Sequence, residues 1–99
     1  QQHAERMALE GYFDHVDAKG RGVGERLLDA GFKFHWAGEN ISAGKSDARA
    51  VFEWWMSSET HRQNILKAEF RVTGFGYFYI AQDRHHFHHY WVEVFASGH

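Results

Sequence analysis

Apolar residues recur every three or four positions at the start of the chain, which is the spacing of a helix with one buried face. Ala4, Met7 and Ala8 share one side of residues 1–10. Gly11 follows as a residue that tolerates the left-handed backbone at a helix end. The pattern predicts a helix over 1–10 that ends at Gly11.

Glycines are concentrated in residues 17–24, where three of them favour a surface loop. A second, short helix is predicted over 25–30. Leu27 and Leu28 are expected to face the core, and Gly31 marks the end of the helix.

The period changes to two at Phe32, Phe34 and Trp36, which is the alternation of a half-buried strand. This strand is expected to lead directly into residues 38–41. Glu39 therefore lies beside a predicted strand and between glycine-marked turns.

The third predicted helix covers residues 47–57 and begins with Ser46 as the capping residue. Its apolar positions predict that Ala50, Val51, Trp54 and either Trp55 or Met56 are buried.

Ser58 is a second candidate cap, and it begins a short helix over 59–66. His61 and Ile65 are four residues apart in that helix and are expected to share a face.

Aromatic and β-branched residues dominate 72–80 and 87–95, and this composition is typical of strands. The polar stretch 81–86 between them favours an antiparallel hairpin. Gly74 and Gly76 remove side chains from one face of the first strand, so another element can approach closely there.

Length and composition favour one domain spanning residues 1–99. The chain is 43% hydrophobic and 17% aromatic, which supports a single aromatic core and is too little for two.

The charge balance excludes a basic surface for nucleic acid. Eleven basic and 13 acidic side chains give a formal net charge of −2. The absence of cysteine excludes disulfides and thiolate metal ligands. No apolar run approaches the roughly 20 residues of a transmembrane helix.

Three residues are candidate ligands of a divalent metal ion. Glu39 stands 24 positions after His15 and 22 before His61. Two imidazoles and a carboxylate suit Zn²⁺ or a similar ion with an open position for water. The alternative is that each is an ordinary surface or hydrogen-bonded residue.

The histidines at positions 85, 86, 88 and 89 form a second cluster in the predicted hairpin, where a solvated polar tip is the favoured interpretation over a metal site. Ser57 and Ser58 adjoin His61, but no Gly-x-Ser-x-Gly turn is present, so they are interpreted as helix caps.

Six motifs together resemble the CAP superfamily of cysteine-rich secretory, antigen 5 and pathogenesis-related 1 proteins, also called the SCP domain. The resemblance covers nearly the whole chain and is closest to the cysteine-free bacterial branch. The motifs are Phe13-Asp14-His15, Gly38-Glu39-Asn40-Ile41, Trp55-Met56-Ser57-Ser58, residues 60–66 (THRQNIL), Gly74-Phe75-Gly76 and residues 90–95 (YWVEVF).

The resemblance implies the α+β class, as an α-β-α sandwich with a central antiparallel sheet, here without the family's first helix. Either the domain is a minimal one, or its first segment is not part of this chain. It also implies a cleft with a metal-binding His/Glu tetrad, onto which His15, Glu39 and His61 map. The fourth position falls on Ser58, and Glu59, one residue further, is the alternative ligand.

Three functions follow from the resemblance. The first is a secreted, extracellular, non-enzymatic domain that binds a divalent metal, expected to be zinc, together with a lipid, a sterol or a surface partner. The second is a metal-dependent, peptidase-like hydrolase in which Glu39 or Glu59 acts as the base. The third is a structural module that docks through an aromatic sheet face into an extracellular assembly.

Overall fold

The computed structural model describes residues 2–16, 20–31, 36–67, 70, 72–83 and 85–97. These residues form four helices and three strands. Their order is α1 (Gln2–Glu10), α2 (Val23–Asp29), β1 (Ala37–Ala43), α3 (Ala48–Ser57), α4 (Glu59–Leu66), β2 (Val72–Tyr79) and β3 (His89–Ala96).

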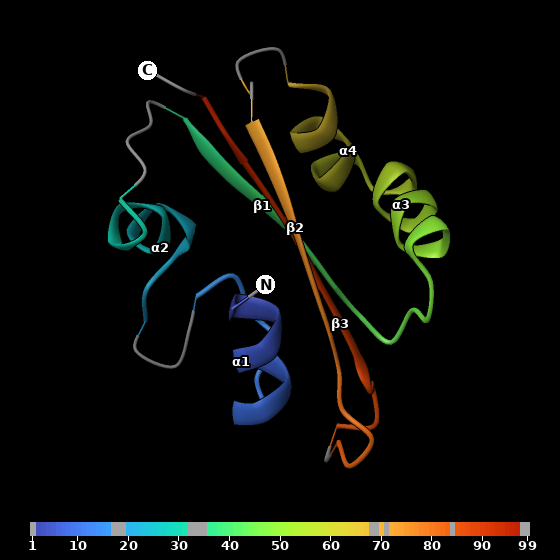
Figure 1. Ribbon diagram of the computed structural model, residues 1–99. Coiled ribbons are helices and arrows are strands. Elements are labelled where there is room, and N and C mark those ends of the chain that lie inside the picture. Colours follow the sequence, from blue (N-terminus) through green and yellow to red (C-terminus); the bar gives the residue numbers. More distant parts are fainter. Residues whose placement is uncertain are drawn as a thin grey trace.

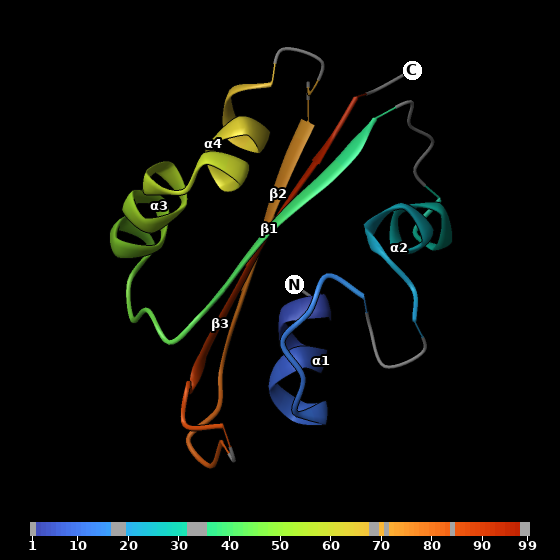
Figure 2. The same cartoon turned by 180° about the vertical axis from the view of Figure 1, so that it is seen from behind.

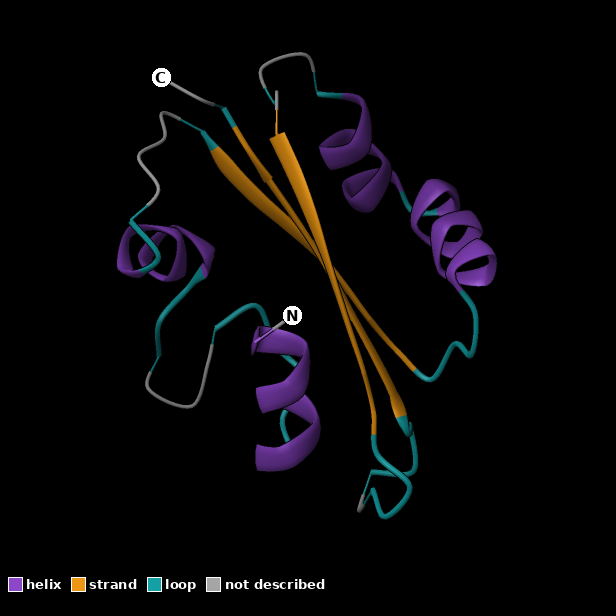
Figure 3. Cartoon of the chain, viewed as in Figure 1, coloured by secondary structure: helices purple, strands orange, loops and turns teal. Residues whose placement is uncertain are grey.

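The strands form an antiparallel sheet with the order β1-β3-β2. Helices α1 and α2 lie on one side of the sheet, and α3 and α4 lie on the other (Figures 1 and 2). The helix–sheet–helix layers are also plain in Figure 3. The predicted α+β sandwich with a central antiparallel sheet is confirmed.

The main core lies between α1 and the sheet. Ala4, Met7 and Ala8 of α1 are buried against Ile41, Tyr90 and Val92. The three- and four-residue spacing of the α1 side chains places them on one stripe, which packs onto the face that the strands present at every second residue.

Glycines lie at the end of α1 and at the start of α2. α1 ends at Glu10, and Gly11 has a positive φ of 77°, as the sequence predicts. α2 begins at Val23, two residues before the predicted start, because Gly22 is already the extended N-cap residue. Leu28 was predicted to be buried, but it is 60% exposed because α2 covers the sheet with only one face.

Asp47 caps α3, where the sequence suggested Ser46. The Asp47 carboxylate accepts a hydrogen bond of 2.8 Å from the Ala50 amide. Trp55 is 1% exposed and Trp54 is 39% exposed. Consecutive helical residues are separated by about 100°, so both tryptophans cannot face the core, and the prediction that Trp54 is buried is wrong.

Ser58 is the N-cap residue of α4, as predicted, although its side chain makes no capping hydrogen bond. The predicted alternation at Phe32 and Phe34 lies outside the described residues. Trp36 lies just before β1 and accepts a backbone hydrogen bond of 2.9 Å from Ser97.

The predicted hairpin is confirmed, because β2 and β3 pair antiparallel. Its second strand begins at His89, two residues later than predicted. His86 and His88 adopt left-handed backbone conformations with φ of 60° and 67°, which end the strand pattern.

Asp83 organises the loop between these strands. Its carboxylate accepts hydrogen bonds from the Tyr90 hydroxyl at 2.6 Å and from the amides of His85, Phe87 and His88. Burial alone would raise the pKa of Asp83, but these hydrogen bonds outweigh it and lower the pKa to about 2. The hairpin loop is therefore an ordered structure built around a buried carboxylate.

We expect Asp83→Asn to lower the free energy of unfolding by on the order of 2 kcal/mol at pH 7. Because the pKa of Asp83 is lowered on folding, its contribution is present above pH 3.8 and is lost as the pH falls toward 2. Urea denaturation at pH 7 and pH 3 measures both effects. Gln82→Ala, at the exposed neighbouring position, is the control; an equal loss in both variants would contradict the assignment.

Candidate functional site

Glu39 lies on β1, and its side chain turns toward the face that carries α1 and α2. That side chain is only 1% exposed. Its Oε1 atom lies 3.1 Å from Nδ1 of His15, and its Oε2 atom accepts a hydrogen bond from the guanidinium of Arg26. Both oxygens of this buried carboxylate therefore have cationic or donor partners.

Arg26 connects three segments that are far apart in the sequence. Besides Glu39, its guanidinium donates to Nδ1 of His3 at 2.7 Å and to the backbone carbonyl of His15 at 3.1 Å. α1, the loop that follows α1, and β1 are thereby attached to α2. We call the residues His3, His15, Arg26 and Glu39 the polar cluster.

The contacts of His3 fix its tautomer. A guanidinium only donates hydrogen bonds, so Nδ1 of His3 accepts and carries no proton. Nε2 lies 2.8 Å from the Asp14 carbonyl, which only accepts, so the proton of the neutral ring is on Nε2. His3 thus acts as a neutral bridge between Arg26 and the loop before His15.

His15 is held in a form that favours its protonation. The hydrogen bond to Glu39 raises the pKa of His15 above its ordinary value, although burial and the Arg26 charge act in the opposite direction. A protonated His15 adds to the positive charge around Glu39.

His61 lies on α4. Its ring packs against Trp54 with centroids 4.8 Å apart. Its Nδ1 atom is buried and has no hydrogen-bond partner among the described residues. Burial lowers the pKa of His61, and the charge on His15 lowers it further. His61 is therefore a neutral imidazole with an unused nitrogen.

Asparagines attach α4 to β1 on this side of the sheet. Asn40 Nδ2 donates to the His61 carbonyl at 3.0 Å, and Asn64 Nδ2 lies 2.9 Å from Asn40 Oδ1 and 3.2 Å from the Glu39 carbonyl. A Cβ atom at Gly38 would lie 2.8 Å from the Phe70 ring, so a larger residue there would require that ring to shift. Asn40 belongs to the motif of residues 38–41 and Asn64 to that of residues 60–66. Their hydrogen bonds fix the position of β1 at Glu39 relative to α4 at His61.

The two candidates for the fourth tetrad position lie at the start of α4. Glu59 is exposed and lines a polar depression with Arg62, Asn64 and Lys67. The hydroxyl of Ser58 lies 3.4 Å from that of Thr60.

The structure thus brings His15 and Glu39 into direct contact and places His61 near them. Within the described ranges, no three or more His, Asp or Glu side chains are grouped closely enough to hold a metal ion. In the hairpin, the His85 ring lies 2.7 Å from the Gly11 carbonyl and the His88 ring 3.1 Å from the Ile80 carbonyl. These two contacts attach the hairpin loop to Gly11 and to the end of β2.

Sequence reasoning missed Arg26 and His3. Both lie in short helices whose apolar spacing identified only the core residues. No local pattern indicated that Arg26 would reach a carboxylate 13 positions away; the sandwich topology alone brings them together.

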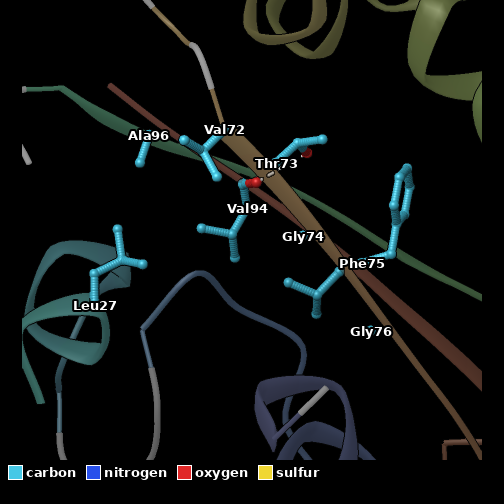
Figure 4. A pocket seen from close by; sticks show the side chains of 9 residues that line it. Leu27, Val72, Thr73, Gly74, Phe75, Gly76, Val94 and Ala96 are labelled. Atoms are coloured by element: carbon cyan, nitrogen blue, oxygen red, sulfur yellow. Dashed lines mark hydrogen bonds between the residues drawn. The ribbon is translucent and has the colours of Figure 1, made fainter. Parts of the chain in front are cut away.

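An apolar pocket of about 280 Å³ lies between α2 and the sheet (Figure 4). Leu27 projects from α2 toward Val72 and Val94, while Phe75 projects from the opposite face of β2 (Figure 4). Glycines at positions 74 and 76 form part of the wall, and a Cβ atom at Gly74 would meet nothing within 4 Å.

A family model described as "CAP: Cysteine-rich secretory protein family" matches residues 1–95. Two proteins of Bacillus subtilis are similar in sequence. An uncharacterized membrane protein, YlbC, is 36% identical over 74 residues, and an uncharacterized protein, YkwD, is 37% identical over 71 residues. These matches cover 75% and 72% of this chain but only 21% and 28% of the relatives.

Two solved structures are similar in fold. An extracellular SCP-domain protein of Bacillus anthracis superposes with a TM-score of 0.81 at 30% identity, over 97% of this chain and 29% of that chain. An outer surface protein of Borrelia burgdorferi gives 0.84 at 14% identity, over 99% of this chain and 69% of that chain. The second likeness concerns the fold alone.

We expect Arg26→Met to lower the free energy of unfolding by about 3 kcal/mol, because it leaves a buried carboxylate without its main counter-charge. The Arg26 side chain is 19% exposed. Arg49 also pairs with a glutamate, but its side chain is 91% exposed. Arg49→Met is therefore the matched control and should leave stability nearly unchanged in urea denaturation. Equal effects of the two substitutions would contradict the central role of Arg26.

Proposed function

This chain belongs to the CAP family of cysteine-rich secretory proteins, and we propose that it is a secreted, non-enzymatic binding domain that takes up a divalent metal ion. The residues that would hold the ion are His15, Glu39 and His61, with Glu59 as a further carboxylate from the start of α4. The observation that carries the proposal is the buried, unpartnered Nδ1 atom of His61.

The chemistry of these donors fits a borderline ion such as Zn²⁺, which is bound by neutral imidazole and carboxylate. The lowered pKa of His61 supports this, because a neutral ring is the ligating form. His15, whose pKa is raised by Glu39, would have to lose its proton when the ion binds. The ion would supply a positive charge at Glu39.

Arg26 already supplies positive charge there and occupies one carboxylate oxygen. The ion and Arg26 therefore compete for Glu39, and binding is expected to be weaker than in a closed structural zinc site.

An extracellular location is supported by the Bacillus anthracis SCP-domain protein, which is an extracellular protein and is 30% identical to this chain. No helix in the described ranges combines the length and hydropathy that a membrane span requires.

We expect isothermal titration with ZnCl₂ at pH 7.5 to show binding that His61→Ala weakens by at least about tenfold. Binding should also weaken below about pH 6, since the histidine ligands must lose their protons.

His86→Ala is the matched control, because His86 lies on the exposed hairpin loop. It tests whether hairpin histidines capture zinc instead. Undiminished affinity in His61→Ala, or a loss confined to His86→Ala, would refute the proposed site.

A second binding activity is supported by the apolar pocket beside α2. Its lining by Leu27, Val72 and Val94 suits a hydrocarbon group, and about 280 Å³ is close to the lower limit of small-ligand pockets. We propose that it holds the apolar part of a lipid or sterol.

We expect Gly74→Leu to abolish saturable binding of a fluorescent fatty acid, because the new side chain enters the open volume of the pocket. Circular dichroism should show an unchanged fold. Tyr79→Leu, on the opposite face of β2, is the control and should leave binding intact. Equal binding by wild type and Gly74→Leu would exclude this pocket as the site.

A further inference from the structure

Glu93 is a buried carboxyl group that neither the proposed metal site nor the apolar pocket beside α2 uses. It lies on the central strand β3, opposite Asn40 of β1 and Phe75 of β2, and it is 6% exposed. Residues directly opposite each other on antiparallel strands face the same side. Because the Asn40 side chain binds α4, the Glu93 side chain also lies on the α4 side of the sheet, away from Arg26.

The hydrogen bonding of Glu93 is incomplete. Within the described part of the chain, Thr73 alone donates to this carboxyl group, from its hydroxyl to Oε2 at 2.9 Å. The same hydroxyl lies 3.0 Å from the Val94 carbonyl (Figure 4), and its single proton is shared between two acceptors. The second oxygen of Glu93, Oε1, is left as an acceptor for a group that enters from outside.

A comparison with Asp83 shows what this shortage of donors means. Both residues are 6% exposed, but the Asp83 carboxylate accepts four hydrogen bonds, which lower its pKa to about 2. At Glu93, burial raises the pKa, and the one hydrogen bond from Thr73 does not offset it. Glu93 therefore lacks the partners that a buried negative charge requires.

A pocket of about 220 Å³ lies beside this carboxyl group. Apart from Glu93 and Thr73, its walls are apolar and consist of Ile65, Phe70, Val72 and Phe95. The Phe70 and Phe95 rings stack with centroids 5.5 Å apart. The Phe70 ring also has the Lys67 ammonium 5.6 Å from its centroid, a cation–π contact with a group of the chain itself. The pocket thus combines one carboxyl group with aromatic walls.

We propose that this pocket binds a primary alkylammonium group, whose cation pairs with Glu93 and whose hydrocarbon chain lies against Phe70 and Phe95. An ammonium group both donates hydrogen bonds and supplies the positive charge that Glu93 lacks. The faces of phenyl rings attract the same cation.

The geometry favours an ammonium group over a guanidinium group. A guanidinium pairs best with both oxygens of a carboxylate, whereas an ammonium is a compact charge that needs only one acceptor. Because Thr73 holds Oε2, only Oε1 is open. A volume of about 220 Å³ is below the range of pockets for drug-sized ligands, so the ligand is a small amine or the end of a lysine side chain.

Isothermal titration with n-butylammonium chloride tests the proposal. We expect saturable binding that Glu93→Gln weakens by at least about tenfold, because glutamine keeps the size of the side chain and removes its charge. Glu53→Gln is the matched control and should leave binding unchanged, since the Glu53 side chain is 68% exposed on α3.

Two further probes separate charge from hydrogen bonding. n-Butanol keeps the hydrocarbon chain without the charge, and butyltrimethylammonium keeps the charge without an N–H donor. Each should bind at least roughly tenfold more weakly than n-butylammonium. Binding of n-butanol as tight as that of n-butylammonium would overturn the role of Glu93, and equally tight butyltrimethylammonium would overturn the proposed hydrogen bond to Oε1.

NMR of the wild-type chain gives a readout that does not depend on a variant folding. The carbon-13 signal of the Glu93 carboxyl group should shift with the dissociation constant measured by titration. Nα-acetyl-lysine methylamide carries the same ammonium group on a peptide unit, and the tighter of the two ligands identifies a free amine or a lysine side chain as the source. An unmoved Glu93 signal, no saturable binding in the millimolar range, or full affinity in Glu93→Gln would refute the site.

Discussion

The buried ion pair between Glu39 and Arg26 is the interaction on which this side of the molecule depends. A carboxylate that is 1% exposed is costly unless it is neutralised and hydrogen-bonded. Arg26 meets this requirement and simultaneously binds His3 and the backbone of His15. One guanidinium therefore joins α1, its following loop, α2 and β1, and the position of His15 is a consequence of that arrangement.

The same carboxylate limits what the site can do. A cation that binds at Glu39 must share it with Arg26, while His61 on α4 offers a buried nitrogen that has no hydrogen-bond partner among the described residues. The polar cluster is thus already balanced in charge before any ion binds. Among the described residues, no group of three or more possible metal ligands is assembled.

Residues 38–41 of β1 contact the helices on both sides of the sheet. Glu39 turns toward α1 and α2, Asn40 binds α4 on the opposite face, and Gly38 leaves room for Phe70. Period-two alternation makes this possible, because adjacent strand residues face opposite ways. The backbone carbonyls of Glu39 and Ile41 accept hydrogen bonds from the side chains of Asn64 on α4 and Trp55 on α3.

The sequence by itself determined the classes of element, because periodicity and glycine positions act locally. It predicted α1, the start of α4 after Ser58 and the β2–β3 pairing, and it singled out Glu39 as a candidate site residue. Tertiary structure decided which tryptophan of α3 faces the core, that Asp83 organises the hairpin loop, and that Arg26 reaches Glu39. These outcomes depend on contacts between residues distant in sequence, whose side chains meet only when the helices pack onto the sheet, and no local pattern encodes that meeting.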